Sequence, residues 1–326
     1  MKRILVTGST GFIGTHLTQK LLEAGYRVKG IDIVPPKPES VHSRFEFEQC
    51  DIGDSDALIE LIVNWAPDAV VHLAARTDLE GKNIRDYEAN VNGVQNLIQA
   101  IQRTPSVRRC VITSSQLVCR AGYVPKHSED YCPTTLYGES KVLTERITKE
   151  TDCGGVIWCI VRPTTIWGPG MSKHYQRFFR SVVSGIYFHV GHSSLWKSYG
   201  YVKNTVHQYL MLLNAEDDLV HRQTFYLADY EPLSLRKWVE DFKMRLGGRP
   251  IRTLPEWLAR LIAIGGDFIS SASGRSFPFN SFRLNNILTE YIFDLSNTQR
   301  VCGSLPYTVE QGIDETVAWL RRERIV

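Results

Sequence analysis

The sequence lacks the patterns that mark several other classes of protein. Its 326 residues include seven cysteines, but these form no Cys-x-x-Cys pair and no Cys/His cluster. We therefore expect neither a metal site nor a disulfide framework. A long apolar run and a signal peptide are also missing, which predicts a cytoplasmic protein with no membrane partner. The 38 basic and 35 acidic residues nearly balance, and the basic ones are spread out, which argues against nucleic acid as a partner.

What the sequence does contain is a glycine-rich turn near its start. Gly8, Gly11 and Gly14 follow the apolar run 4–6 and precede apolar residues at helical spacing between 12 and 22. A helix N-terminus has unpaired amides and a partial positive charge, and glycine lets a phosphate approach the backbone. The turn therefore predicts a pyrophosphate cradle, although a tight strand-to-helix connection would have the same sequence.

The next expected strand, residues 27–32, ends in Asp32. In dinucleotide-binding folds, a carboxylate at this distance from the glycine turn binds the adenosine ribose hydroxyls. Asp32 would repel a 2′-phosphate, and residues 33–36 offer no arginine to bind one, so NAD is favoured over NADP. An acidic residue that only caps a turn is the alternative.

Apolar strands then alternate with amphipathic helices, which predicts a doubly wound α/β fold with a parallel sheet covered on both faces. We expect strands at 45–50, 69–73, 109–113 and 156–161, and helices at 56–65, 84–103 and 133–151.

Three of these strands are followed by residues suited to ligand binding. Right-handed crossovers bring the carboxyl ends of parallel strands to one edge, where ligands bind. We therefore expect one crevice to be lined by Asp51-Ile52, His72-Leu73-Ala74-Ala75 and Thr113-Ser114-Ser115. Helix capping by Asp51 and simple packing by Ala74 and Ala75 are the plainer interpretations.

Tyr137 and Lys141 are four residues apart in an expected helix. This spacing places both side chains on one face, where the ammonium can lie close to the phenol and favour its ionised form. A phenol with an ordinary pKa of about 10 could then act as a base nearer neutrality. Such a pair is mostly structural when it occurs alone, but here it follows the serine-rich strand end and the glycine turn.

Together these elements resemble the extended short-chain dehydrogenases/reductases, in particular the NAD-dependent nucleotide-sugar epimerase/dehydratase branch that includes UDP-glucose 4-epimerase. The resemblance covers nearly the whole chain. It implies a Rossmann domain at 1–165, to which 203–228 returns, and a smaller C-terminal α/β substrate-binding lobe mainly at 166–326. The matching segments are 7–14, 32, 51–52, 72–75, 90, 114–115, 137–141 and 162–170.

The resemblance also implies roles for particular residues. Tyr137 would be the catalytic acid/base, Lys141 would bind the nicotinamide ribose and tune the tyrosine, and Ser115 would hydrogen-bond the reacting oxygen. The implied NAD contacts are Gly8, Thr10, Gly11, Phe12, Ile13, Gly14, Asp32, Asp51, Ile52, Leu73, Ala74, Ala75, Asn90, Thr113, Tyr137, Lys141, Pro163 and Thr165. The implied contacts to a nucleotide-diphosphate sugar are Arg76, Gln116, Thr165, His174, Lys197 and Arg283.

Members of this branch are often homodimers that pair through four helices. The apolar residues that could face the partner, or equally pack in the core, are Leu97, Ile98, Ile101, Val142, Leu143 and Ile147.

Departures from the family pattern narrow the range of reactions that the chain is expected to catalyse. Ser115 is followed by Gln116-Leu117, whereas nucleotide-sugar dehydratases have an Asp-Glu pair and UDP-glucuronate decarboxylases have a glutamate at the place of Leu117. A 4-epimerase therefore comes first, because a preference for NAD suits an oxidant that is retained. A 4-ketoreductase or dehydrogenase is the alternative. A dinucleotide sensor without catalysis is disfavoured because Ser115, Tyr137 and Lys141 are all present.

Other departures affect the sugar nucleotide. Lys197 stands in place of the usual arginine, so a point charge would replace a bidentate phosphate contact, and Thr165 replaces an asparagine. His174 lies near the acid histidine of GDP-4-keto-6-deoxymannose epimerase/reductases. The cysteine partner of that histidine would fall at Gln116, so a surface or loop histidine is favoured.

Two further segments border the expected substrate site. Cys119-Arg120 stands where many relatives have Tyr-Gly, which suggests a sugar with extra bulk or negative charge. The serine- and glycine-rich stretch 270–276 is expected to be a loop that could bring Arg275 or Arg283 near phosphate.

Overall fold

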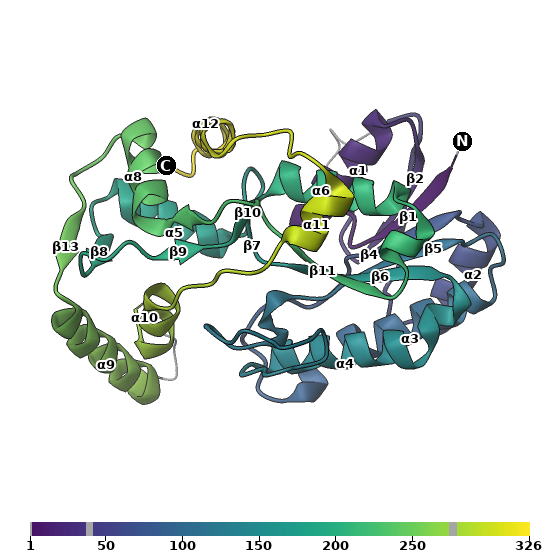
Figure 1. The fold of residues 1–326 in the computed structure, drawn as a ribbon, viewed down its shortest axis with the longest axis horizontal. Helices are drawn as coiled ribbons and strands as arrows, with labels where there is room; N and C mark the ends of the chain where they lie inside the picture. The colour runs from purple at the N-terminus through teal and green to yellow at the C-terminus, as the bar shows by residue number, and fades with distance from the viewer. Residues whose placement is uncertain (1, 37–41, 274–278) are drawn as a thin grey trace. The chain divides into compact units, whose positions relative to one another are not determined.

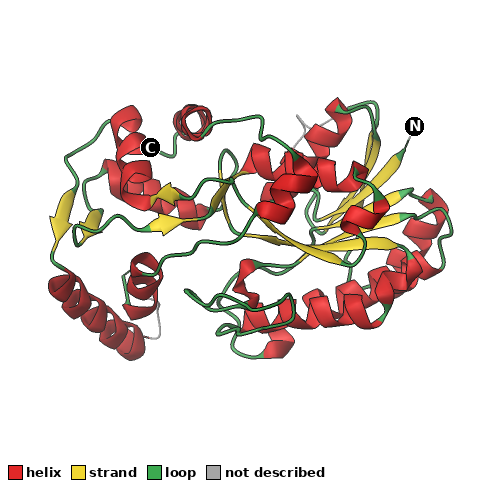
Figure 2. Cartoon of the chain, viewed as in Figure 1, coloured by secondary structure: helices red, strands yellow, loops and turns green. Residues whose placement is uncertain are grey.

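The computed structural model describes residues 2–36, 42–273 and 279–326. The chain divides into two compact units. Unit 1 comprises Met1–Ile166, Gly200–Tyr230 and Asp294–Tyr307, and unit 2 comprises Trp167–Tyr199, Glu231–Phe293 and Thr308–Val326. Figure 2 shows the helices and strands of both. Among the described residues, none of the helices has the length and apolar composition needed to cross a bilayer.

Unit 1 is built on a parallel sheet of seven strands (Figure 1), which confirms the Rossmann-type α/β fold expected from the sequence. In sheet order the strands are β11 (Gln223–Leu227), β6 (Ile157–Pro163), β5 (Arg109–Thr113), β4 (Ala69–His72), β1 (Arg3–Thr7), β2 (Arg27–Asp32) and β3 (Phe45–Gln49). The chain builds outward from β1 to β3 and then returns to place β4 beside β1. The strand order therefore reverses between β1 and β4, the place where such sheets bind ligands.

Helices cover both faces of this sheet (Figure 1). One hydrophobic cluster joins the sheet to α2 (Ser55–Trp65), α3 (Glu88–Gln102) and α4 (Leu136–Glu150). The other joins it to α1 (Phe12–Glu23), α6 (Val202–Asn214) and α11 (Ser296–Cys302). The remaining turns of helix in unit 1 are η2 (Ile84–Tyr87), η3 (Gln116–Val118), η4 (Asp152–Gly155) and α7 (Asp217–Val220).

Five of the six residues considered for a dimer face, all except Leu143, pack within the hydrophobic clusters of unit 1. Leu97, Ile98 and Ile101 are buried in the first cluster, and Ile147 packs against it. Val142 is buried in a small cluster with Val118 and Cys119. The core interpretation therefore holds for these residues, and a homodimer stays a prediction.

Local capping sets where two of the helices begin. The Asp54 carboxylate accepts a hydrogen bond from the Ala57 amide and caps α2, whereas Asp51 accepts one from the Gly53 amide at 2.8 Å and closes the preceding turn. Thr135 caps α4 through the Gly138 amide, so this helix begins later than the expected residue 133.

Unit 2 has an aromatic core in which the rings of Trp167, Phe179, Trp238 and Phe242 meet at centroid distances such as 5.5 Å for Trp167–Trp238 and 4.5 Å for Phe179–Phe242. Its elements are α5 (Lys173–Val183), β8 (Phe188–Val190), β9 (Trp196–Lys197), β12 (Leu233–Ser234), α8 (Leu235–Leu246), β13 (Arg252–Leu254), α9 (Glu256–Ser273), α10 (Ser281–Leu288) and α12 (Val309–Arg322). The chain passes between the units near β7 (Thr165–Trp167) and β10 (Tyr199–Tyr201).

The expectation of a loop at 270–276 is wrong for residues 270–273, because α9 continues through Ser273. The Ser270 hydroxyl donates to the Gly266 carbonyl at 2.7 Å, which satisfies this polar side chain within the helix. Residues 274–276, including Arg275, lie outside the described part of the chain.

Candidate active site

The glycine turn between β1 and α1 brings three stretches of backbone very close together. Gly8 has a φ of +70°, and a Cβ atom there would lie 2.7 Å from the Ala74 amide nitrogen at the end of β4. A Cβ atom on Gly14 would lie 2.0 Å from the Gly8 carbonyl oxygen. Gly11 caps α1 without a side-chain hydrogen bond. The first amides of α1 therefore face a cradle that a side chain would fill, which fits the pyrophosphate of NAD.

Replacing Gly14 with alanine is expected to remove most of the bound NAD. The added methyl group would collide with a main-chain oxygen, and either the turn or α1 would have to shift. We expect NAD affinity to fall by more than about tenfold, since the cradle depends on close backbone approach. Isothermal titration with NAD would measure the change. Gly265→Ala is the matched control because a Cβ atom there meets nothing within 4 Å, and an equal loss in that variant would contradict the steric argument.

Asp32 ends β2 beside the same turn. Its carboxylate accepts hydrogen bonds from the Thr10 amide at 3.1 Å and the Val34 amide at 3.2 Å. These bonds fix the carboxylate against the glycine turn and leave lone pairs that could accept ribose hydroxyl groups.

Asp32→Ser is expected to weaken the preference for NAD over NADP. The substitution removes the negative charge that repels a 2′-phosphate and a charged acceptor for the ribose hydroxyls. The loss of such a charged hydrogen bond corresponds to about ten- to a hundredfold in NAD affinity. Competitive titration with both dinucleotides would check the ratio. Asp218→Ser, which alters an exposed carboxylate on α7, is the matched control, and an unchanged ratio in Asp32→Ser would refute the assigned role.

A buried histidine organises the end of β4. Burial and the nearby Lys141 lower the pKa of His72 to about 3, so its ring is neutral. The Thr7 hydroxyl can therefore donate to His72 Nδ1 at 2.8 Å while it accepts from the Leu73 and Ala74 amides. These contacts lock β4 to β1 at the point where the strand order reverses. Sequence reasoning placed the Leu73-Ala74 backbone here but missed the part played by Thr7.

Ser115, Tyr137 and Lys141 lie together in unit 1. Tyr137 and Lys141 are on α4, and Ser115 follows β5 and caps η3. The close approach of α4 to η3 depends on Gly138, since a Cβ atom there would lie 2.2 Å from the Leu117 carbonyl oxygen. Sequence reasoning missed this glycine, which allows the tyrosine and serine hydroxyls to meet.

The electrostatics of this group differ from the expectation. Burial raises the pKa of Tyr137 to about 12, although a hydrogen bond with Ser115 acts in the opposite direction. Burial also lowers the pKa of Lys141 to about 8, with Glu145 opposing the shift, and its ammonium donates to the Thr113 carbonyl at 2.9 Å. The expected lowering of the tyrosine pKa is thus wrong for the chain itself, because desolvation of the phenolate outweighs favourable contacts.

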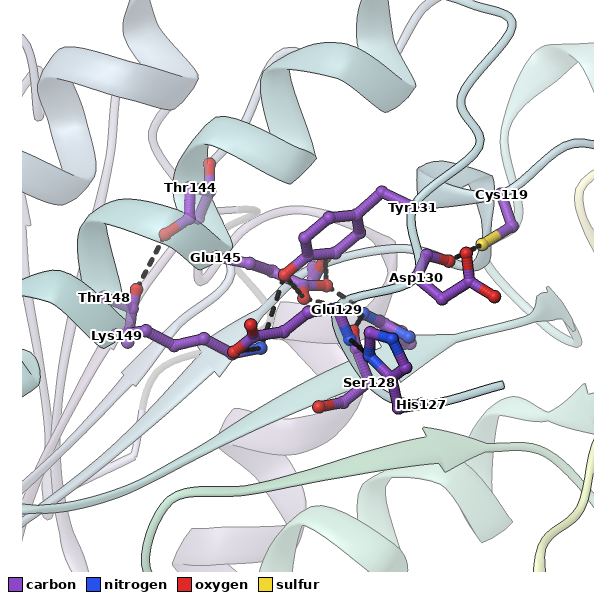
Figure 3. A network of polar contacts seen from close by, with 12 residues as sticks. Cys119, His127, Ser128, Glu129, Asp130, Tyr131, Thr144, Glu145, Thr148 and Lys149 are labelled. Carbon is purple, nitrogen blue, oxygen red and sulfur yellow. Dashed lines mark hydrogen bonds and ion pairs between the residues drawn. The ribbon is translucent and has the colours of Figure 1, made fainter. Parts of the chain in front are cut away.

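Behind these residues lies a buried ion pair that the sequence did not reveal. Glu145, one helical turn beyond Lys141, binds Arg162 through both carboxylate oxygens at 2.8 and 2.7 Å. It also accepts hydrogen bonds from Ser114 Oγ at 2.5 Å and the Tyr131 hydroxyl at 2.9 Å. Figure 3 shows Glu145 and Tyr131 within the surrounding polar network. Ser114 precedes Ser115, and the two form the loop after β5, which we call the serine loop. The ion pair therefore ties the serine loop to α4.

Other residues predicted for NAD have structural contacts of their own. Asn90 is buried, with its side chain bonded to the Arg76 amide, the Arg76 carbonyl and Ser140 Oγ. Thr113 Oγ1 lies 2.8 Å from the Tyr209 hydroxyl. Ile52 belongs to the core cluster with α2 and α3. These residues hold the strand ends in place, and direct contacts with NAD stay predictions.

The residues predicted for the sugar nucleotide are divided between the units. In unit 1, Gln116 Nε2 donates to Thr165 Oγ1 at 3.4 Å. Arg76 pairs with Asp78 at 2.8 Å and its guanidinium also donates to the Asp86 carbonyl.

In unit 2, Lys197 is buried, and its ammonium donates to the Asn286 and Thr289 carbonyls. Burial lowers the pKa of Lys197 to about 8. Arg283 lies in the first turn of α10, which Asn280 caps. His174 lies in α5, and its side chain is outside the described part. The proposed phosphate contact of Lys197 therefore competes with contacts inside unit 2.

Comparison with known proteins shows which family model and which relatives this chain matches. The sequence model of the NAD dependent epimerase/dehydratase family matches residues 4–228. A 3 beta-hydroxysteroid dehydrogenase/Delta 5-->4-isomerase of Mycobacterium tuberculosis is 27% identical, with 97% of this chain and 90% of that protein covered. An N-acetyl-alpha-D-glucosaminyl-diphospho-ditrans,octacis-undecaprenol 4-epimerase of Escherichia coli O157:H7 is 26% identical, with 97% and 94% covered.

A solved structure shares the fold. UDP-glucuronic acid 4-epimerase from Bacillus cereus, determined in complex with UDP-glucuronic acid and NAD, superposes with a TM-score of 0.75 at 20% identity, and 98% of this chain and 99% of that chain are covered.

Proposed function

Because the chain belongs to the NAD dependent epimerase/dehydratase family, we propose that it is a 4-epimerase of diphosphate-linked sugars that works through a transient 4-keto sugar. The observation that carries the proposal is the group formed by Ser115, Tyr137 and Lys141 at the carboxyl edge of the sheet, beside the glycine turn. We assign the NAD site to unit 1 and further sugar-nucleotide contacts to unit 2.

NAD, the cofactor of this family, supplies reversible oxidation of the sugar carbon when it is bound. Tyr137 removes the proton from the C4 hydroxyl group and later returns one to the C4 oxygen. Ser115 hydrogen-bonds this oxygen and, through its bond to the phenol, favours the ionised tyrosine. Lys141, held by the Thr113 carbonyl, adds positive charge on the same face of α4. The buried Glu145–Arg162 pair keeps the serine loop and α4 in register.

The reaction assigned to Ser115, Tyr137 and Lys141 requires no additional carboxyl group. The two positions after Ser115 are Gln116 and Leu117, so an adjacent carboxyl group that could assist loss of water or of carbon dioxide is missing from this turn. Epimerisation requires only oxidation at C4, rotation of the keto sugar and reduction from the other face, which supports it over dehydration.

A dehydrogenase acting on a secondary alcohol is the second candidate. It is favoured by the mycobacterial relative named for hydroxysteroid oxidation, which aligns over 97% of this chain. The same tyrosine, serine and lysine would serve, but the cofactor would exchange after each turnover. The substrate classes also differ, since the relatives are named for a hydroxysteroid and for a sugar on undecaprenyl diphosphate.

Mass spectrometry of the small molecules released from the freshly purified, denatured protein separates these candidates. A 4-epimerase is expected to retain NAD in nearly equimolar amount and to interconvert the C4 epimers of UDP-glucose, UDP-N-acetylglucosamine or UDP-glucuronic acid without added cofactor. Protein that arrives without NAD and requires added NAD for each turnover would move the dehydrogenase to first place.

A further inference from the structure

Helix α9 in unit 2 buries small residues and exposes large apolar ones, the reverse of an ordinary surface helix. Its small residues Ala259, Ala263 and Gly266 are buried, and the two alanines pack in a cluster with Val190 and Leu284. Six of the seven large apolar residues of the helix instead face solvent, and only Leu258 is half-buried. A surface helix normally buries its large apolar side chains, so this arrangement calls for something to cover the outer face.

The outward residues form a continuous row. Its members follow one another at intervals of four, three and four residues, the spacing that keeps side chains on one face of a helix. Their exposed fractions are 64% for Trp257, 58% for Leu261, 60% for Ile264 and 78% for Phe268, and Ile262 and Ile269 flank them at 39% and 48%. Single exposed apolar residues are ordinary, whereas a contiguous patch marks an interaction surface.

We propose that this outer face of α9 docks on an anionic lipid surface. The charged residues Glu256, Arg260 and Asp267 occupy one edge of the helix, where Arg260 pairs with Glu256 at 2.6 Å. An apolar face with tryptophan and phenylalanine and a polar margin is the composition of helices that lie in the plane of a membrane interface. Figure 1 shows α9 next to α10 within unit 2.

The distribution of charge favours anionic lipid as the occupant. Unit 2 contains 16 lysines and arginines against 10 aspartates and glutamates, a formal charge of +6, whereas unit 1 contains 22 against 25, a formal charge of −3. Arg249 and Arg252 are exposed directly before α9. Basic residues beside an interfacial helix add electrostatic attraction to anionic headgroups.

The size of the patch argues against a second copy of the chain. From Trp257 to Phe268 the row is about 17 Å long, and a helix is about 10 Å across. At about 150–250 Å² for a whole aromatic side chain, the exposed parts of this row present an accessible area on the order of several hundred Å², which is below the roughly 800 Å² per partner of a stable protein interface. A bilayer surface can accept one helix face without such an area.

The proposal goes beyond the assigned reaction and does not depend on it. It also departs from the expectation of no membrane partner, which rested on the lack of a long apolar run. Apolar residues spaced around one face of a helix, with small and charged residues between them, produce no such run in the sequence.

Flotation of the full-length protein with lipid vesicles tests the proposal. The protein is expected to float with vesicles that contain phosphatidylcholine and phosphatidylglycerol, and less so with phosphatidylcholine alone or at high salt. Leu261→Gln/Phe268→Gln should lower partitioning by more than about tenfold. Met244→Gln, which alters another exposed apolar residue of unit 2, should leave partitioning unchanged.

Three results would overturn the proposal. The wild-type protein could stay with the soluble fraction under all lipid compositions, or the double variant could bind as tightly as wild type. Alternatively, light scattering could reveal a self-association that the double variant abolishes, without vesicle binding, which would make the face an interface between copies. Thermal unfolding confirms that each variant is folded, and Phe268→Gln alone replaces the double variant if that one is not.

Discussion

Tyr137→Phe is expected to lower turnover by about 10²- to 10⁴-fold, the usual contribution of a positioned acid/base group. The variant keeps the buried ring and its packing against Tyr87 but loses the hydroxyl group that exchanges a proton with the sugar. Because the glycine turn and Asp32 are untouched, the amount of NAD retained should not change. Turnover of the epimerised sugar and the NAD content of the same preparation are the two measurements.

Tyr26→Phe provides the matched control for this experiment. Its hydroxyl group donates to Asn214 at 2.7 Å, far along the chain from the serine loop, and its loss should leave turnover close to wild type. Full activity in Tyr137→Phe would contradict the assigned chemistry, and full NAD binding without turnover in the wild type would support the dinucleotide sensor instead.

Glu145→Gln is expected to lower the free energy of unfolding by about 3–5 kcal/mol, since it leaves a buried guanidinium without its counter-charge. Arg162 is almost completely buried and donates to both oxygens of Glu145. Burial lowers the pKa of Arg162, and in the wild type Glu145 outweighs this effect. A guanidinium stays protonated in proteins even without a counter-charge, so the variant contains a buried, unpaired positive charge. Urea denaturation followed by circular dichroism measures the loss.

The double variant Glu145→Gln/Arg162→Met separates the unpaired charge from the loss of packing. Removing both charges should recover part of the lost stability, because replacing a whole buried pair costs less than breaking it. A Glu145→Gln protein within about 0.5 kcal/mol of wild type, the range of ordinary surface substitutions, would show that the pair is not needed to hold the serine loop.

The glycine turn, the alternation of strands and helices, and the serine–tyrosine–lysine group could be predicted because each follows from short-range patterns. Hydrophobic periodicity placed β5 correctly at 109–113. The glycines in the turn indicate that the backbone at Gly8 and Gly14 approaches its neighbours closely, including the end of β4. Such signals depend on neighbouring residues in the sequence and need no knowledge of the packing.

The other features of the site depend on contacts between segments that are far apart in the sequence. Nothing in the spacing of Glu145 and Arg162 indicates that both are buried and paired, and Lys197 meets the Asn286 and Thr289 carbonyls from 89 and 92 residues away. The pKa of Tyr137 follows from its burial, which a helical spacing of four cannot reveal. The outer face of α9 was missed for the opposite reason, since apolar residues at helical spacing normally point inward.

Transfer of a deuterium label tests the central claim most directly. A sugar nucleotide with deuterium at C4 is incubated with the purified protein, and the product is analysed by mass spectrometry and NMR. A 4-epimerase is expected to give the C4 epimer with deuterium still at C4 and no net change in the redox state of the cofactor in solution. Loss of the label from C4, with its appearance on released nicotinamide and accumulation of a keto sugar, would contradict epimerisation and identify a dehydrogenase.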